Sequence, residues 1–362
     1  MKSEIIDFFS LKRNVVVVSG VGFLLSLGEE LWSRFIPKYL EALGAGVFAI
    51  GLFGALKDLL DAVYQYPGGF VADRFGRKNA LVLFSALSLA GYVIYLLAPS
   101  YVFIFLGLFF VMSQSSLALP ATFAIIGDSL PKERRTMGFT VQSLLKRVPI
   151  VIAPPVGGLL IVKYGLVEGV KMGLLITIFF TLFAVIIQRK SYDEPPRENK
   201  IKGGLFEQYA KMNASLKKLL LTDILIRLAE GIPKVFLILY IINILGFDAL
   251  GFGSFIALQM LVSIIVYIPV ARYADRFGRK PFVILTFIFF TLFPLAVVLA
   301  KSFWLLVIAF VIAGLRETGE PARKALIVDL TSAETRGRQV GLYYLIRSFA
   351  VFPASIIGAV LW

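Results

Sequence analysis

Long apolar runs alternate with short clusters of charged and turn-forming residues along the whole chain. The runs approach or exceed the roughly 20 residues that a helix needs to cross a bilayer, so each predicts a membrane-spanning helix. Six runs come first, at residues 15–40, 47–71, 80–98, 102–126, 139–162 and 172–188. Five more occupy residues 219–245, 252–270, 282–300, 303–328 and 340–362. The pattern predicts an all-α membrane protein with eleven spans.

A polar stretch separates the two groups of runs. Residues 189–218 contain many Lys and Arg together with adjacent Asp193, Glu194, Pro195 and Pro196, a composition that does not insert into a bilayer. The predicted organisation is therefore an N-terminal six-helix bundle at residues 1–188, a cytoplasmic linker at 189–218, and a C-terminal bundle with five helices at 219–362.

The composition excludes several classes of protein. Hydrophobic residues make up 58% of the 362 residues and the mean hydropathy is +0.84, which no water-soluble surface tolerates. Without Cys or His, the chain offers neither a thiol nucleophile nor imidazole chemistry. It also shows no P-loop pattern for an ATP-driven pump. We expect neither an enzyme nor a cofactor.

The formal charge of +14 raises the possibility of nucleic-acid binding, but the basic residues fall mainly in alternate loops. That asymmetry is typical of a membrane protein whose basic loops lie in the cytoplasm. It predicts a cytoplasmic N-terminus, a location in the plasma or inner membrane, and no nucleic-acid partner.

One six-residue motif occurs twice. The sequence Asp-Arg-Phe-Gly-Arg-Lys follows the second apolar run at residues 73–78 and the eighth at residues 275–280. The correspondence extends to Pro67 and Pro269, Pro120 and Pro321, Asp128 and Asp329, and Glu29 and Glu230. One half is thus a copy of the other with parallel topology, which is typical of carriers whose halves rock about a central site.

Residues 69–78 fit the pattern G-x-x-x-D-R-x-G-R-K, which resembles the loop signature of the major facilitator superfamily. The second copy has Ala271 in place of the first Gly, and residues 128–138 resemble the family's end of the fourth helix. The resemblance covers essentially the whole chain and implies a transporter with two pseudo-symmetric six-helix bundles. Because the family usually has twelve helices, we expect that a twelfth is missing here; we also expect a monomer.

The resemblance implies a cytoplasmic gate. In the family, the loop Asp interacts with the start of a helix in the other half, and the loop Arg pairs with an acid ending the fourth or tenth helix. Carried over, Asp73 and Asp275 face the starts of the eleventh and fifth helices, and the ion pairs are Arg77 with Asp128 and Arg279 with Asp329. The implied gate residues are Gly69, Asp73, Arg74, Gly76, Arg77, Asp128, Arg134, Asp275, Arg276, Gly278, Arg279 and Asp329. The alternative is that the basic ones only anchor the topology.

Ionisable residues lie at membrane depth in many predicted spans, where each costs at least about 2.5 kcal/mol to insert unless it faces the protein interior. The third, sixth and ninth spans have none in their interiors, which suits lipid-facing positions. The family fold likewise places these three helices outside. The candidates for the substrate cavity and for proton coupling are Glu29, Asp58, Asp61, Arg147, Glu230, Arg316, Glu317 and Glu320.

Many of these charges have an oppositely charged residue four positions away, so intrahelical pairing is an alternative to function. The spaced pairs are Glu30 with Arg34, Lys57 with Asp61, Glu230 with Lys234, and Arg316 with Glu320. Glu29, Asp58 and Glu317 lack such a neighbour. We hypothesise that these three include a proton carrier driven by the proton gradient, with Arg147 as a counter-charge.

A partial motif in the fifth span bears on the class of substrate that is transported. Residues 153–158, Ala-Pro-Pro-Val-Gly-Gly, partly resemble the G-P-x-x-G-G signature of drug and proton antiporters, although close helix packing is an equal alternative. Those antiporters often carry an Arg in the fourth helix, where this chain has Gln114, Ser115 and Ser116. The leading hypothesis is a proton-coupled exporter of small amphipathic molecules. A proton symporter importing a sugar or organic acid is the alternative, and a non-transporting receptor or scaffold is a distant third.

Overall fold

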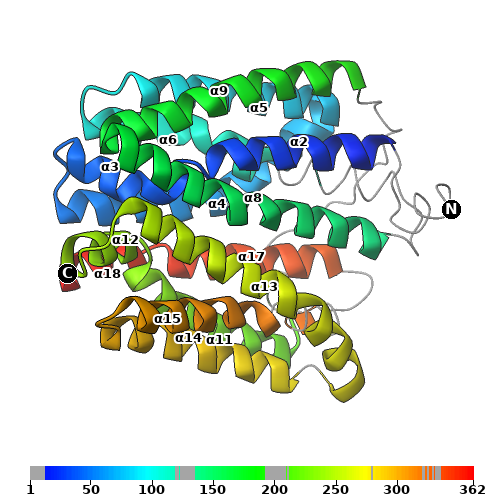
Figure 1. The fold of residues 1–362 in the computed structure, drawn as a ribbon. Helices are drawn as coiled ribbons and strands as arrows, with labels where there is room; N and C mark the ends of the chain where they lie inside the picture. Colours follow the sequence, from blue (N-terminus) through cyan, green and yellow to red (C-terminus); the bar gives the residue numbers. More distant parts are fainter. Residues whose placement is uncertain are drawn as a thin grey trace, which may run out of the picture. The chain divides into compact units, whose positions relative to one another are not determined.

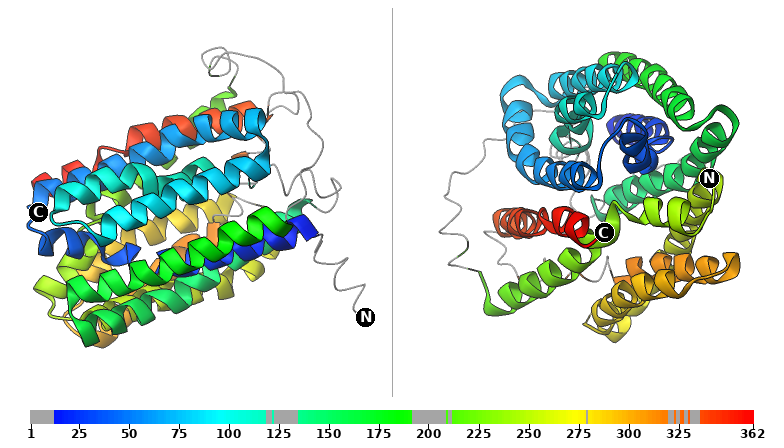
Figure 2. Two further views of the ribbon diagram at one scale, coloured as in Figure 1. Left: turned by 90° about the horizontal axis from the view of Figure 1, so that it is seen from above. Right: turned by 90° about the vertical axis from the view of Figure 1, so that its left-hand side faces the viewer.

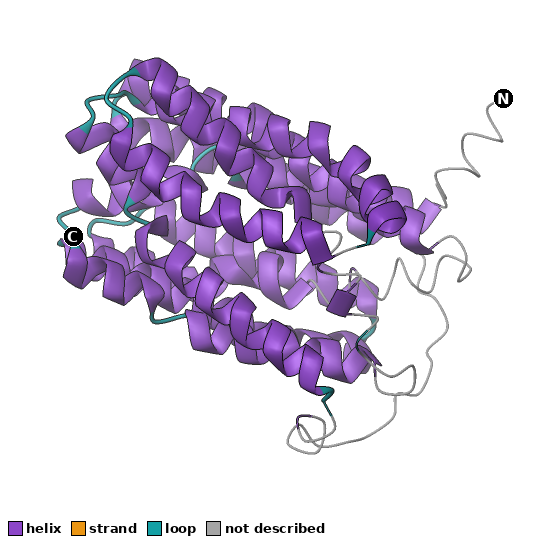
Figure 3. Cartoon of the chain, turned by 90° about the horizontal axis from the view of Figure 1, so that it is seen from below, coloured by secondary structure: helices purple, strands orange, loops and turns teal. Residues whose placement is uncertain are grey.

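The structure is a computed structural model, which describes residues 13–118, 122, 135–191, 209, 212–278, 280–319, 323, 326–327, 330 and 336–362. All regular elements within these ranges are helices, and none of the described residues forms a strand (Figure 3). The prediction of an all-α fold is confirmed.

The helices of the N-terminal part follow the predicted spans closely. They are α2 (Arg13–Glu29), η1 (Ser33–Phe35), α3 (Ile36–Ala42), α4 (Val47–Phe75), α5 (Arg77–Leu96), α6 (Tyr101–Met112), η2 (Ser113–Leu117), α8 (Arg135–Tyr164) and α9 (Leu166–Ser191). Those of the C-terminal part are α11 (Ala214–Lys234), α12 (Leu237–Leu239), η4 (Tyr240–Ile244), α13 (Ala249–Phe277), α14 (Lys280–Leu299), α15 (Phe303–Leu315), η5 (Arg316–Gly319), α17 (Arg336–Val351) and α18 (Ala354–Leu361).

The duplicated motif produces the same backbone geometry twice. Helices α4 and α13 both contain 29 residues and both end at a Phe followed by Gly. Gly76 and Gly278 each have a φ of 90°, a left-handed conformation that glycine adopts without strain. The turn sets the direction of the following helix, so the repeat seen in the sequence is also a repeat of structure.

Several predicted spans are not single regular helices; one break lies at residues 352–353, between α17 and α18. Helix α2 ends at Glu29, before η1 and α3, and α11 ends at Lys234, before α12 and η4. Pro37 lies in the first turn of α3, where its missing N–H is tolerated, and Pro233 lies in the last turn of α11, where it removes one backbone donor. The predicted span at 15–40 agrees with a single segment, Val16–Ala42, that is long and apolar enough to cross a membrane, although its helix is broken after Glu29. The break after Lys234 in α11 lies at a similar place in the second half.

The chain packs into two compact units. The first contains residues 1–46, 60–198 and 248–253, and the second contains residues 47–59, 199–247 and 254–362. This grouping follows packing rather than chain order, since α4 contributes its first part to the second unit and the rest to the first. The bundle boundaries drawn from the linker stay a prediction.

Within the first unit, α5 packs against α6 and α9, and α2 packs against α8 and α9 (Figure 1). Buried apolar side chains of α2, α4 and α5 form one of its core clusters, centred on Ala80 and Phe84. Within the second unit, α14 packs along α15, and α11 contacts α17 and α18 (Figure 2).

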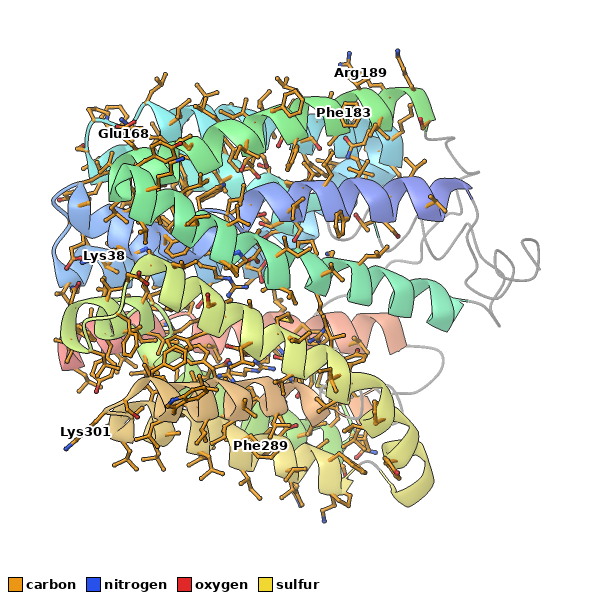
Figure 4. All side chains as sticks on the ribbon, viewed as in Figure 1. Lys38, Glu168, Phe183, Arg189, Phe289 and Lys301 are labelled. Atoms are coloured by element: carbon orange, nitrogen blue, oxygen red, sulfur yellow. The ribbon has the colours of Figure 1, made fainter. Side chains whose placement is uncertain are left out.

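The outer surfaces are those of a membrane protein. Seven helical segments among the described residues are long and apolar enough to cross a membrane, and two shorter ones are also apolar. Helices α9 and α14 carry many exposed apolar side chains, as their charge-free interiors predicted, whereas Glu168 and Arg189 lie at opposite ends of α9 (Figure 4). The count of eleven spans stays a prediction.

Candidate functional site

A cavity of about 170 Å³ lies in the first unit among α2, α5, η2, α8 and α9. Its apolar lining comes mainly from one face of α2. Its polar lining comprises Ser19, Ser26, Glu29, Lys78, Gln114, Ser115, Thr122, Lys146 and Gln188. One carboxylate and two ammonium groups therefore contribute to the wall of a single cavity.

The polar wall depends on a π-helical turn. Residues 113–117 form η2, and the backbone N–H of Gln114 donates to Ser88 Oγ at 2.8 Å. The Ser85 hydroxyl lies 2.9 Å from Gln114 Oε1 and 3.1 Å from Gln188 Oε1, so one serine orients both amides. Isolated π-turns in helices are frequent at functional sites because they redirect side chains.

The same turn engages one of the predicted acids. Ser116 is buried and donates its hydroxyl hydrogen to Asp61 Oδ1 at 2.7 Å. The intrahelical alternative paired Asp61 with Lys57, but the contact that Asp61 makes is with Ser116. The carboxylate instead links α4 to η2.

Glu29 is held at the cavity by the packing of the residues that follow it. The Trp32 indole N–H donates to Thr177 Oγ1 at 3.0 Å, and the ring contacts Tyr92 and Tyr95 edge to face. These buried contacts fix the C-terminal end of α2 against α5 and α9. Glu29 therefore occupies a defined place in the cavity wall, where a residue that binds substrate or a proton would have to lie.

Glu230, the counterpart of Glu29 in the repeat, lies between two arginines of the second unit. Its carboxylate accepts hydrogen bonds from Arg227 Nη1 at 2.9 Å and from Arg316 Nη1 at 3.2 Å. Both guanidinium groups lie over the ring of Phe290, and Arg316 also lies over Phe293. The intrahelical alternative paired Glu230 with Lys234, but the ion pairs of Glu230 are with the two arginines.

Lys234 pairs with Asp58 instead. Its Nζ lies 3.0 Å from Asp58 Oδ1, which joins α11 to the first part of α4. Asp58, which has no oppositely charged residue four positions away, thus has a partner on another helix. By contrast, the Glu30 and Arg34 pair forms as predicted, at 2.7 Å.

The most buried ionic cluster was not among the candidates. Asp223 on α11 is ion-paired to Arg323 and to Arg347, at 3.5 Å for the latter, and it accepts a hydrogen bond from the Tyr343 hydroxyl at 3.0 Å. An acid inside the apolar run 219–245, four residues before Arg227, was the available signal. Its main partners lie 100 or more residues away, where spacing rules give no information.

The remaining candidates are placed individually. Lys146, rather than its neighbour Arg147, contributes to the cavity wall; Arg147 lies half-buried on α8. Glu317 lies on η5, and Glu320 lies outside the described residues, so its pairing with Arg316 stays a prediction.

Only part of the predicted gate can be located. Gly69 lies within α4, Arg74 is exposed with its guanidinium over Phe75, and Arg77 begins α5 half-buried. The side chains of Asp73, Asp275 and Arg276 lie outside the described part of the structure, as do residues Asp128, Arg134, Arg279 and Asp329. The gate pairs stay a prediction.

Comparison with known proteins decides the family. The model of the Major Facilitator Superfamily matches residues 18–225 and 219–362. The chain belongs to the Major Facilitator Superfamily. Members of the superfamily are transport proteins, so the chain is a multi-pass membrane transporter and not an enzyme.

Individual members of the superfamily resemble the chain over almost its full length. An uncharacterized MFS-type transporter from Methanocaldococcus jannaschii is 24% identical, with 97% of this chain and 89% of the relative covered. The multidrug resistance protein MdtG of Serratia proteamaculans is 24% identical, with 96% and 87% covered. The crystal structure of a bacterial homolog of the human lysosomal transporter Spinster matches with a TM-score of 0.75 at 16% identity, covering 97% of this chain and 81% of that one. The structural match supports the superfamily fold.

Proposed function

We propose that this transporter exports small amphipathic molecules in exchange for protons, by alternating access across an inner membrane with its N-terminus in the cytoplasm. The observation that carries the proposal is the cavity of the first unit, in which Glu29 lies among amide, hydroxyl and ammonium groups. The multidrug resistance protein MdtG, similar over 96% of the chain, supports export of this class of molecule.

Glu29 is proposed as the proton carrier. A carboxylate at membrane depth costs least in its neutral form, whereas contact with water and with a cationic partner favours the ionised form. When access changes sides, the preferred form changes with it, and a proton is taken up on one side and released on the other. Asp58 is less suited, because its carboxylate lies within 3.0 Å of the Lys234 ammonium.

Export is tested in liposomes containing the purified protein, with an imposed pH gradient and ethidium as an amphipathic probe. We expect Glu29→Gln to reduce proton-driven ethidium transport by about tenfold or more, equivalent to about 1.4 kcal/mol or more. Exchange of ethidium without a gradient should persist, because the amide retains the shape of the side chain. Asp58→Asn is the matched control, since it also neutralises one carboxylate but lies outside the cavity lining.

Two results would contradict the proposal. Full proton coupling in Glu29→Gln would show that the carrier is a different group. Proton-dependent accumulation of a sugar or an organic acid, without ethidium transport, would establish the symporter instead.

A further inference from the structure

Four ionisable side chains with alternating charge follow one face of α11. Asp223, Arg227, Glu230 and Lys234 are spaced by four, three and four residues, which places them on one side of a helix. The Arg227 guanidinium lies 2.9 Å from Glu230 Oε2 through Nη1 and 3.8 Å from Asp223 Oδ1 through Nε. One guanidinium is therefore within ion-pair distance of two carboxylates.

These two carboxylates have different surroundings. The Asp223 side chain is 1% exposed, and it binds Tyr343 and Arg347 of α17 as well as Arg323. The Glu230 side chain is 24% exposed and pairs with Arg316. Arg227 thus joins a partly accessible acid to a buried acid that attaches α17 to α11.

The position of Arg227 allows it to change partner. Its guanidinium lies 4.9 Å from the centre of the Phe290 ring, a flat surface over which it can turn without losing that contact. The shorter distance shows that Glu230 holds it in the described state. The charged groups facing Glu230 are Arg227 and Lys234 of α11 and Arg316 of η5, with Glu317 next to Arg316 in the chain.

We propose that Arg227 is a positioning residue that transmits the charge of Glu230 to the contact between α11 and α17. The inference goes beyond the proposed function, in which Glu29 is the carrier, because it adds proton binding by Glu230, the counterpart of Glu29 in the repeat. When Glu230 binds a proton, its carboxyl group becomes neutral. The negative charge that attracts the Arg227 guanidinium is then lost. The guanidinium then moves toward Asp223 and competes with Arg347, whose 3.5 Å contact is longer than that of the Tyr343 hydroxyl. The hold of α11 on α17 is thereby loosened.

The chain contains no Cys, so a pair of spin labels can be attached without removing native thiols. Leu221 of α11 and Phe349 of α17 are 59% and 58% exposed, and Leu221→Cys with Phe349→Cys places one label on each helix. The distance between the labels is measured by double electron–electron resonance in detergent, from acidic to alkaline pH. We expect the distance distribution of the parent protein to shift with pH. In the Glu230→Gln variant, the distribution seen at acidic pH should be found at every pH.

Arg227→Gln should abolish this pH response, whereas Arg227→Lys, which retains a cation, should preserve part of it. Lys234→Gln is the matched control, because it removes a cation that also faces Glu230 but pairs with Asp58 rather than Asp223. It should keep the response of the parent protein, with the midpoint moved to higher pH because one cation near Glu230 is lost. A response that survives Arg227→Gln or Glu230→Gln would overturn the proposal, as would the absence of any response in the parent protein. The measurement needs neither substrate nor gradient, so its failure is distinct from a failure of ethidium export.

Discussion

Replacement of Asp223 by alanine is expected to lower the free energy of unfolding by about 3–5 kcal/mol, the usual cost of removing one partner from a buried ion pair. The substitution leaves Arg323 and Arg347 without the carboxylate that they share, and it removes the nearer acceptor of the Tyr343 hydroxyl. Arg323 is itself buried, so water cannot replace the lost partner.

Thermal unfolding of the detergent-purified protein measures this effect. Glu168→Ala is a suitable control, because it removes an acid from an exposed pair with Lys171, where a loss of about 0–1 kcal/mol is usual. Asp223→Asn should fall between the two, since an amide can still accept from Tyr343 but carries no charge. Equal melting temperatures for Asp223→Ala and Glu168→Ala would show that the cluster does not contribute to stability.

The features predictable from the sequence are those determined by local pattern. The repeat at residues 73–78 and 275–280 corresponds to the same glycine turn in both halves, because a φ near 90° favours glycine. The helices α4 and α13 extend through the first three residues of each motif, beyond the predicted spans at 47–71 and 252–270. The absence of charge inside α9 and α14 likewise anticipated their exposed apolar faces. Both follow from properties of neighbouring residues.

The partners of the charges could not be predicted in the same way. A pair four residues apart on a helix contributes only about 0.2–0.5 kcal/mol, so tertiary contacts readily override it. Glu230 pairs with Arg227, three residues away, but also with Arg316, 86 residues away, although Lys234 lies one turn along. Gln114 was noted only for not being Arg, yet the π-turn at η2 places it in the cavity wall. A π-turn has no simple sequence signal, which is why this part of the site was missed.

The glycines of the segment 153–158 are expected to be indispensable for packing. A Cβ built on Gly157 would lie well inside 3.0 Å of the Leu31 carbonyl oxygen, and one on Gly158 would meet the backbone of Ala249 as closely. Across the same contact, a Cβ on Gly253 would meet the backbone of Pro154. Small residues that let helix backbones approach are the usual basis of helix association in membranes, so the packing interpretation of this segment accounts for its glycines.

Gly157→Ala and Gly20→Ala should therefore change stability in opposite directions. At Gly157 the added methyl group forces a backbone shift, and overpacking of this kind costs about 1–3 kcal/mol. At Gly20, in helix α2, no described atom lies within 4 Å of the new Cβ, so the higher helix propensity of alanine should stabilise the protein by up to about 1 kcal/mol. The melting temperatures of the two variants in detergent provide the measurement. If Gly157→Ala melts at or above the temperature of Gly20→Ala, the close approach of α8 to the chain at Leu31 does not limit stability, and the glycine must be explained by movement during transport instead.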